Sequence, residues 1–579
     1  MQDLQIKKQS KTYDAVIVGS GAGGGMAAYI LAKEGLKVCL IEAGPMYDPK
    51  INVTQLKNPW ESPRRGGSTR FRPFGDFDAS YWGWDIDGEP YTHKDNTKWA
   101  WWRSRMVGGR TNHWGRISLR FGPKDFKRKS IDGLGDDWPI GYDHIKPYYD
   151  RLDRLVGIFG SYENLENEPD GVFLPPPKPR LHELMIKNAA TKAGINVIPS
   201  RLSVLTQKIN DERGVCFYCG QCNRGCQVYA DFSASSVLVN PAVNTGNVDL
   251  ITDAMAREVI TNADGLATGI SYVNKEDLQE YQVMGKTVIL AASACESARL
   301  LLNSKSSRHP NGLANDSNVV GKYLHDSTGV GMGGVLPDLF GRKRYNEDGV
   351  GGAHIYSPWW LDNKKLDFPR GYHIEYSGGM GQPSYGFGFG IEGVNGKYAV
   401  NGTKKEAGGY GKSLKEDYRY FYGANVGMAG RGEAIALESN YCEIDPKMVD
   451  KWGIPVLRFH YKWSEHEINQ AKHMQETFKE IMHQMGAVIT YGGNHGPENN
   501  YGLADPGRII HEAGTVRMGN DKKRSALNKW SQAHDCKTLF VVDGGQFVSQ
   551  ADKNISWTIM ALSMRTSEYI IEEMKKQNL

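Results

Sequence analysis

The segment "YDAVIVGSGAGGGMAAYILAKEGLKVCLIEAG", residues 13–44, constrains the fold more than any other part of the chain. The β-rich run "AVIV" precedes a glycine turn, alanines and leucines at helical spacing follow as far as Gly35, and "KVCLIE" completes a second strand. Strand, glycine turn, helix and strand in this order are typical of the unit that opens a dinucleotide-binding domain. We therefore predict a Rossmann-type α/β fold at the start of the chain.

Three glycines of this segment, Gly19, Gly21 and Gly24, form the pattern G-x-G-x-x-G. Such glycines turn the chain tightly, let the backbone approach a pyrophosphate and pack the helix on the strand, while the amino terminus of the helix holds the anion. Glu42 ends the second strand, where a carboxylate can accept hydrogen bonds from a ribose diol. The segment therefore predicts a dinucleotide site.

A second match to the glycine pattern lies at Gly329, Gly331 and Gly334. The sequence "VLPDLFG" follows it, and Pro337 prevents a regular helix there. We interpret this match as a glycine-rich strand or turn. The chain is therefore expected to hold one dinucleotide fold.

The rest of the chain alternates between two patterns. Residues 287–304 predict strand, turn and helix, and residues 538–576 predict a closing strand and helix. Residues 325–460 contain many glycines and tyrosines and short alternating runs such as "YGFGFGIEG", which favour a twisted antiparallel sheet. Helices are expected at residues 138–160 and 464–486, the second one amphipathic.

Composition narrows the function classes. The 70 basic and 66 acidic residues nearly balance, and no basic run is dense enough to predict nucleic-acid binding. No window reaches about 18 uninterrupted apolar residues, so we expect no membrane span. The amino terminus shows no apolar stretch before a small-residue cleavage site, so we expect no export signal in this chain.

Four of the eight cysteines fall within the stretch "GVCFYCGQCNRGC", namely Cys216, Cys219, Cys222 and Cys226. Their spacing, C-x2-C-x2-C-x3-C, is that of ferredoxin runs, in which thiolates wrap a cuboidal iron–sulfur cluster. Structural zinc usually takes two C-x2-C pairs separated by a longer loop. Inert or structural cysteines and zinc stay open as alternatives. The other cysteines lie far apart in the sequence, which argues against a disulfide scaffold.

Six motifs in chain order resemble the glucose–methanol–choline (GMC) oxidoreductase family over nearly the whole chain: "VIVGSGAGGG", "LIEAG", "MVGGRTNHWG", "VILAASACESARLLL", "HEAGTVRMG" and "LFVVDGGQF…NISWTIMALSMR". The resemblance implies FAD, bound extended with its ADP half on the first motif. It further implies cofactor-binding roles for Gly108, Gly109, Asp543 and Gly544. It also implies a second domain that covers the flavin and shapes the substrate pocket.

The expected fold is therefore an α/β FAD-binding Rossmann-type domain, discontinuous in sequence, with an α+β substrate domain built on a mainly antiparallel sheet. The predicted division of the chain is 1–60, 227–324 and 505–579 for the FAD-binding domain, 61–213 for flavin-covering loops and helices, 214–226 for a cysteine-rich insertion, and 325–504 for the substrate-binding domain.

By the same resemblance, His511 and Asn554 are the catalytic pair beside the flavin ring. Oxidation of an alcohol by hydride transfer to flavin N5 needs a base for the hydroxyl proton, and an imidazole suits that role. An amide can hold the hydroxyl oxygen so that the hydride points at the flavin. Asn554 also stands where the last helix begins, so we expect it to act as the N-cap as well, with the positive helix end aimed at the flavin.

His113, in "VGGRTNHWG", resembles a histidine that is bonded covalently to the flavin in some members of the family. We predict a covalent FAD at His113, with simple stacking in the tryptophan-rich loop as the alternative. Large subunits of certain sugar dehydrogenases in the family carry a [3Fe-4S] cluster in a comparable cysteine-rich insertion. That resemblance implies a [3Fe-4S] or [4Fe-4S] cluster on the four cysteines, passing electrons from flavin to a cytochrome.

We therefore expect an FAD-dependent dehydrogenase of a sugar or glycoside hydroxyl, with the 3-hydroxyl of a glycoside as first choice. The expected partners are a small subunit and a cytochrome c acceptor, with membrane contact only through them. The expected location is the periplasm, reached by co-export with the partner subunit, and the cytoplasm is the alternative. An oxygen-dependent oxidase, a non-catalytic flavin or iron–sulfur scaffold and a nicotinamide-dependent dehydrogenase are the rival functions.

Overall fold

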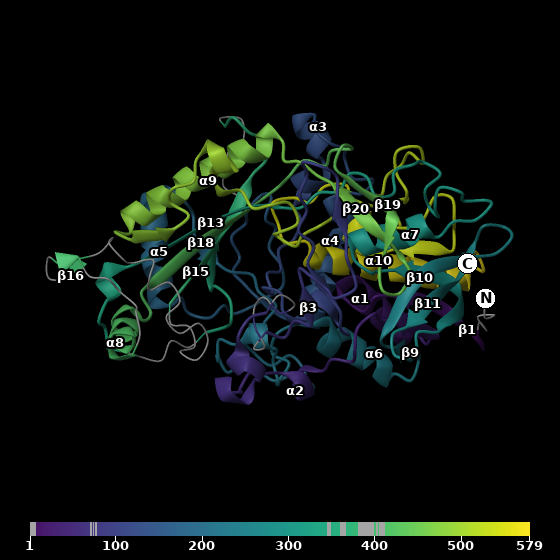
Figure 1. Cartoon of the computed structure of the whole chain (residues 1–579), viewed down its shortest axis with the longest axis horizontal. Helices are drawn as coiled ribbons and strands as arrows, with labels where there is room; N and C mark the ends of the chain where they lie inside the picture. The colour runs from purple at the N-terminus through teal and green to yellow at the C-terminus, as the bar shows by residue number, and fades with distance from the viewer. Residues whose placement is uncertain are drawn as a thin grey trace.

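The structure is a computed structural model that describes residues 7–69, 72, 75, 78–343, 349–358, 366–379, 399–400, 403–404 and 411–579. Two sheets organise these residues, and they lie at opposite ends of the long axis in Figure 1. The first sheet, with helices α1, α7 and α10, lies on the right of that view, where both chain ends also lie. The second sheet, with helices α5 and α9, lies on the left.

The first sheet has seven strands in the order β10-β11-β12-β1-β2-β9, with β22 pairing β12. The strands β1, β2, β9, β12 and β22 pair in parallel, and β10 and β11 extend the sheet antiparallel beyond β12. Every residue of β2 is buried, as expected for a parallel strand covered on both faces. The bounds are β1 Lys7–Val18, β2 Val38–Ile41, β9 Val248–Ile251, β10 Ala254–Thr261, β11 Ala267–Asn274, β12 Glu280–Leu290 and β22 Leu539–Val541.

Three helices bring their amino termini to one end of this sheet: α1 (Ala22–Lys33), α7 (Ala294–Asn303) and α10 (Ser556–Lys575). Helices α1 and α10 pack against each other. The expected strand, glycine turn, helix and strand at the start of the chain are present as β1, α1 and β2. The predicted closing strand and helix are present as β22 and α10.

The second sheet is antiparallel, with the order β21-β13-β18-β15-β14-β8. Its residues alternate between buried and partly exposed along β18, so one face can meet a core. Helix α9 (Glu465–Gln484) contacts β13 and β18 and buries Met474 and Phe478 there. The bounds are β8 Ile198–Pro199, β13 Thr328–Val335, β14 Ile355–Ser357, β15 Tyr372–Gly378, β18 Asn425–Gly432 and β21 Val488–Tyr491.

Several expectations from the sequence can be compared with these elements. The second glycine match is the strand β13, as predicted. The helix expected at 138–160 is α4 (Tyr142–Val156), and the one expected at 464–486 is α9. The run "YGFGFGIEG" (385–393) lies outside the described residues.

Four elements pack against a different part of the fold from the one predicted for their segment. Helix α5 (Leu181–Lys192) and strand β8 come from the region expected to cover the flavin, yet α5 packs on α9 and β8 closes the second sheet. Strands β19 (Tyr441–Val449) and β20 (Pro455–His460) come from the expected substrate domain, yet both contact α7. Contacts over long sequence distances decide these placements, and local patterns do not reveal them.

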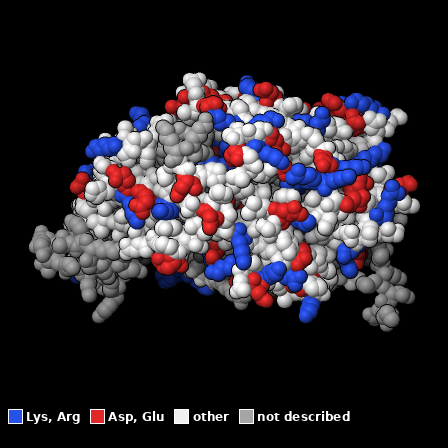
Figure 2. Space-filling view, turned by 90° about the horizontal axis from the view of Figure 1, so that it is seen from above, with Lys and Arg blue, Asp and Glu red and all other residues white. Residues whose placement is uncertain are grey.

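The remaining helices and strands belong to neither of the two main sheets. They are α2 Pro49–Asn52, α3 Arg128–Asp132, α6 Asn240–Asn244, α8 Gly411–Phe421, β3 Trp82–Gly83, β4 Thr92–His93, β5 Arg103–Ser104, β6 Ile158–Phe159, β7 Phe173–Leu174, β16 Ala399–Val400 and β17 Thr403–Lys404. Among the helices that the structure describes, none is long and apolar enough to cross a membrane. On the face seen in Figure 2, basic and acidic side chains are interspersed.

Candidate active site

A cavity of about 430 Å³ lies where the first sheet meets the loops that link the two sheets. Its walls come from chain segments far apart in the sequence. Nine of the residues predicted from the sequence line it: Gly19, Gly21, Glu42, Gly109, His113, His511, Asp543, Gly544 and Asn554. Gly24 and Gly108 lie behind the wall. Gly24 packs on the carbonyl of Gly19, and the Gly108 N–H donates to Ser20 Oγ over 2.9 Å.

The glycine turn leaves no room for side chains. Gly19 has φ +92°, and a Cβ on it would lie 2.4 Å from the carbonyl oxygen of Ala291. A Cβ on Gly24 would lie 1.8 Å from the carbonyl oxygen of Gly19. At Gly21, by contrast, an added Cβ has no protein atom within 4 Å. The first turn of α1 also has no side-chain cap, so its N–H groups remain available for an anion such as pyrophosphate.

We expect Gly24→Ala to lower the melting temperature by several degrees even with excess FAD, because the added methyl overpacks the turn at a cost of about 1–3 kcal/mol or more. Gly21→Ala is the matched control. It is expected to keep the melting temperature in excess FAD while it weakens FAD binding, because its methyl enters the cavity. Thermal melts with and without added FAD measure both effects. Identical melts for Gly24→Ala and the wild type would contradict this packing.

Glu42 directly follows β2 and lines the cavity. Its Oε2 accepts hydrogen bonds from Ser20 Oγ at 2.6 Å and Ser20 N at 3.1 Å, and its Oε1 accepts from Gly44 N at 2.9 Å. Burial raises the pKa of Glu42, and these donors oppose the rise. A buried carboxylate at this position, beside an uncapped helix terminus, suits the ribose and pyrophosphate of a dinucleotide. The residues present therefore fit the ADP half of FAD.

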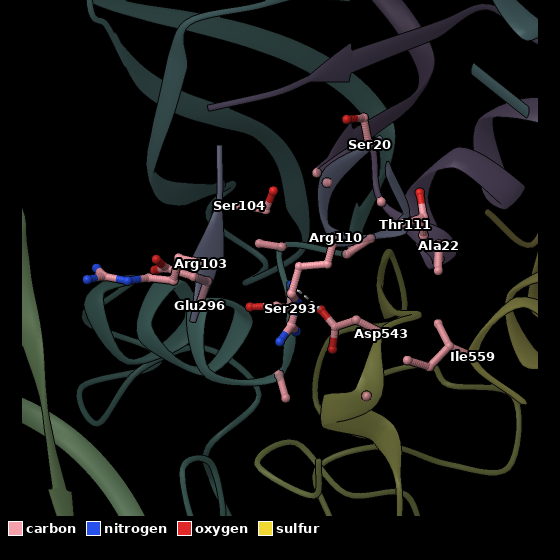
Figure 3. A pocket seen from close by; sticks show the side chains of 18 of the residues that line it. Ser20, Ala22, Arg103, Ser104, Arg110, Thr111, Ser293, Glu296, Asp543 and Ile559 are labelled. Carbon is pink, nitrogen blue, oxygen red and sulfur yellow. Dashed lines mark hydrogen bonds between the residues drawn. The ribbon is translucent and has the colours of Figure 1, made fainter. Parts of the chain in front are cut away.

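The middle of the cavity is polar. In Figure 3, Arg110, Ser293 and Asp543 lie together. Asp543 Oδ2 accepts from Ser293 N at 3.2 Å and from Ser297 Oγ at 2.5 Å, and burial raises its pKa to about 6. Arg110 forms a 2.7 Å ion pair with Glu512.

His511 and Asn554 face each other at the other end of the cavity. Asn554 Nδ2 lies 3.3 Å from His511 Nε2 and 3.4 Å from Glu375 Oε1. Asn554 Oδ1 is buried and has no hydrogen-bond partner among the described residues. The expected N-cap role of Asn554 is wrong, because α10 starts after Ile555 and has no side-chain cap. The amide turns into the site instead, and the uncapped first turn of α10 still opens on the cavity.

The surroundings of His511 select one tautomer. Its Nδ1 lies 3.0 Å from Ser327 Oγ, which also accepts a 2.5 Å hydrogen bond from Gln550 Nε2. An amide N–H faces Nε2, so the proton of the neutral ring belongs on Nδ1, where Ser327 accepts it. Asp326 Oδ1 holds the backbone N–H of His511 at 2.8 Å. Burial and the Arg431 charge lower the pKa of His511 to about 3, so Nε2 is an unprotonated acceptor at neutral pH.

A charged group from the second sheet lies next to Asn554. Glu375 Oε2 lies 3.6 Å from the Arg431 guanidinium, and Glu375 Oε1 lies 3.3 Å from His373 Nε2. Burial alone would raise the pKa of Glu375, but Arg431 and His373 outweigh it and lower the pKa to about 2. An ionised carboxylate therefore lies next to the Asn554 amide.

His113 lines the main cavity and also a second cavity of about 130 Å³ behind it. Its Nε2 lies 3.3 Å from Ser104 Oγ, and burial followed by the charges of Arg116 and Arg110 lowers its pKa to about 3. Cys222 lines the far side of the second cavity. Cys222 of the cysteine-rich loop and His113 therefore line the same small cavity.

All four cysteine sulfurs accept N–H donors. Tyr218 N lies 3.4 Å from Cys216 Sγ, Gln55 Nε2 lies 3.0 Å from Cys219 Sγ, and Gly351 N lies 3.3 Å from Cys222 Sγ. The backbone N–H groups of Val228, Ala230 and Asp231 face the Cys226 sulfur. Burial raises the pKa of Cys216, Cys222 and Cys226, and these donors oppose the rise.

The cysteine sulfurs are not arranged for a single ion. No three of them, all within the described residues, lie within 4.8 Å of one another. A tetrahedral zinc site needs sulfurs about 3.8 Å apart, which follows from Zn–S bonds of about 2.3 Å.

Family comparison identifies the class. The GMC oxidoreductase model for the amino-terminal part matches residues 13–328, and the one for the carboxyl-terminal part matches residues 438–563. The chain belongs to the GMC oxidoreductase family. It is therefore an FAD-dependent enzyme that oxidises CH–OH groups of alcohols or sugars.

The chain is also similar to individual proteins of known activity or structure. The chain is 28% identical to 2-methyl-1,2-propanediol dehydrogenase of Mycolicibacterium austroafricanum, covering 96% of this chain and 95% of that protein. It is 25% identical to the fructose dehydrogenase large subunit of Gluconobacter japonicus, over 99% and 100% of the two chains. Formate oxidase of Aspergillus oryzae RIB40 shares the fold with a TM-score of 0.66 at 15% identity, over 98% and 100% of the two chains.

Sequence reasoning missed several residues of the site. Ser327 and Asp326 follow His325 in "YLHDSTG", a run without a recognisable pattern. Glu375 and Arg431 come from strands β15 and β18, where alternation predicts a sheet but not which side chains approach Asn554. Only the register of the second sheet reveals them.

Proposed function

We propose that the protein is a dehydrogenase of a sugar or glycoside hydroxyl that passes its electrons through an iron–sulfur cluster to a cytochrome. The 3-hydroxyl of a glycoside is the preferred substrate position, ahead of carbon 1 of glucose, fructose, gluconate or another polyol. The polar residues His511 and Asn554, both of which line the cavity, with Glu375 next to Asn554, support a substrate that carries several hydroxyl groups.

The reaction uses the paired side chains described above. The substrate hydroxyl donates its proton to His511 Nε2. Asn554 Oδ1, which has no partner among the described residues, can accept a hydrogen bond from a neighbouring hydroxyl of the substrate and so orient the carbinol carbon. Ser327 retains the Nδ1 proton of His511, so Nε2 stays the acceptor. When bound, FAD supplies the acceptor for the hydride. Uncapped N–H groups of α10 offer positive partial charge at this end of the cavity.

The position of the cysteine-rich loop is the main observation that supports the proposed electron route. Cys222 reaches the small cavity behind His113, and every one of the four sulfurs has N–H donors. Gly351 must be a glycine here, because its Cβ would lie 2.6 Å from Cys222 N. A cluster held by these cysteines would therefore lie next to the flavin cavity, where it can accept electrons one at a time.

The surface around the loop supports a protein partner. The loop contacts residues 54–55 through Gln55, whose Oε1 accepts from Gln227 N at 3.1 Å. The same two segments expose large apolar side chains, with exposed fractions of 80% at Ile51, 66% at Leu56, 70% at Trp60 and 50% at Phe217. Large apolar side chains with this much exposure are candidates for an interaction site. We propose a small subunit or cytochrome c as the partner, and a periplasmic location reached by co-export with the small subunit.

Anaerobic purification followed by iron, acid-labile sulfide and flavin analysis with EPR tests the proposal. About three or four irons per flavin, with a matching signal, are expected. Steady-state reduction of a dye and of cytochrome c by a panel of sugars, with NMR of the product, then identifies the carbon oxidised. Flavin without iron, with oxygen consumed as fast as the dye is reduced, would replace the proposal by the oxidase alternative.

We also propose a covalent bond between FAD and His113, which lines the cavity. Acid precipitation of the wild type is expected to leave the flavin in the protein pellet, whereas His113→Ala is expected to release all of it. His460→Ala is the control, because His460 contacts Glu443 and does not line the cavity. Complete release of FAD from the wild type would show that His113 only contacts the flavin.

A further inference from the structure

A second group of potential metal ligands lies outside the flavin cavity. His309, Asp316 and Asp535 each offer one ligand atom, and the three atoms lie within 4.8 Å of one another. His309 and Asp316 belong to the loop after α7, and Asp535 belongs to the segment before β22. None of the three lines the flavin cavity or the small cavity beside the cysteines.

Nδ1 of His309 is available to bind a cation. The residue is 2% exposed, and its Nε2 faces the carbonyl oxygen of Gly265 at 3.4 Å. A proton on Nε2 donates to that carbonyl and leaves Nδ1 as a lone-pair acceptor. Nδ1 is buried and has no hydrogen-bond partner among the described residues. Histidines that bind metals usually donate their other ring N–H to a carbonyl in this way.

The two carboxylates complete the set. Asp316 Oδ1 lies 3.6 Å from His309 Nδ1, and Asp535 Oδ1 is a second buried atom without a partner. Asp535 Oδ2 accepts from Asp316 N at 3.4 Å, which holds the two residues together. In the part of the chain that the structure describes, neither carboxylate forms an ion pair with lysine or arginine. Their charges therefore lack a cationic partner.

From this geometry we propose that His309, Asp316 and Asp535 bind one divalent transition-metal ion, with Zn²⁺ as the favoured ion. One imidazole nitrogen and two carboxylate oxygens are ligands that zinc accepts. Ligands at about 2.1 Å in a tetrahedron stand about 3.4 Å apart, close to the observed 3.6 Å. Asp316 is 63% exposed at its side chain, which leaves the fourth position open to water.

The ion would join two parts of the FAD-binding region. The loop that carries His309 and Asp316 follows the carboxyl end of α7, whose amino end lines the flavin cavity. The segment that carries Asp535 leads through β22 to Asp543 in the same cavity. Bound Zn²⁺ therefore stabilises the outer side of this region rather than acting in the reaction.

The test uses the flavin-loaded protein after treatment with EDTA. Titration calorimetry with Zn²⁺ is expected to show one site per chain, and bound Zn²⁺ is expected to raise the melting temperature by about 1–3 °C. Asp316→Asn, on the surface, is expected to weaken zinc binding at least tenfold and to remove the thermal shift. Asp264→Asn, an exposed carboxylate next to Gly265 that offers no ligand atom to the group, is the matched control and is expected to bind as the wild type does.

Iron and flavin content separate this site from the cysteines. Asp316→Asn is expected to keep the iron-to-flavin ratio of the wild type while it loses zinc. His309→Ala provides a second variant with the same expected loss of zinc. Equal zinc affinity in the wild type and Asp316→Asn, or the absence of any zinc site, would overturn the proposal.

Discussion

Replacing His511 by alanine is expected to lower kcat by about 10²–10⁴-fold, the usual contribution of a positioned base. Two basic groups face Asn554 Nδ2 among the described residues, namely the His511 imidazole and the Glu375 carboxylate. The two oxygens of Glu375 already face Arg431 and His373, so His511 Nε2 is the better placed acceptor for the hydroxyl proton. Flavin content should remain that of the wild type, because the glycine turn and Glu42, which are expected to hold the ADP half of FAD, are unchanged.

Anaerobic stopped-flow measurement of flavin reduction by the best sugar of the panel checks this expectation directly. His473→Ala is the control, since His473 lies in α9, contacts Tyr372 and does not line the cavity. It should reduce flavin within about twofold of the wild type. Ser327→Ala should be intermediate and should change the pH profile, because Nδ1 loses the acceptor that selects its tautomer. Near-normal flavin reduction by His511→Ala would show that another group takes the proton.

Replacing Cys222 by serine is expected to lower cytochrome c reduction by about 100-fold or more while flavin reduction by substrate persists. A lost thiolate ligand breaks the cluster, and the flavin then has no route to the acceptor. Cys222 is the natural choice, because it lines the small cavity behind His113. The iron-to-flavin ratio should fall with the cytochrome activity.

Cys536→Ser is the matched control for this experiment. Cys536 is also buried, and its sulfur accepts a 3.2 Å hydrogen bond from Ala267 N, far in sequence from the cysteine-rich loop. This variant should keep the iron content and both rates of the wild type. If Cys222→Ser keeps its iron, or if it loses flavin reduction to the same degree as cytochrome reduction, the cysteines have a structural role instead.

Local sequence was sufficient for the cofactor end of the site. The glycine turn, Glu42 and the start of α1 could be predicted because short-range spacing encodes backbone conformation, and they lie together in the cavity. His511 and Asn554 came from ordered motifs, and the structure places them 3.3 Å apart. The N-cap assigned to Asn554 failed because a preference for helix ends is weaker than a polar contact inside a cavity.

The second sheet shows where local sequence is insufficient. Its period predicts strands, but a shift of one residue would turn every side chain to the other face. The observed register places His373 opposite Arg431 and Glu375 opposite Ala429, so Glu375 and Arg431 become diagonal neighbours. That register depends on burying the whole apolar face against α9.

The sequence by itself determined the dinucleotide fold and the four-cysteine loop and predicted the pair His511 and Asn554, because short motifs encode each of them. Only the tertiary structure decided that Ser327 and Glu375 flank this pair, that Cys222 lies behind His113, and that His309 meets two aspartates. Such contacts join residues far apart in the chain. They form only when the complete core packs, so no local pattern carries them.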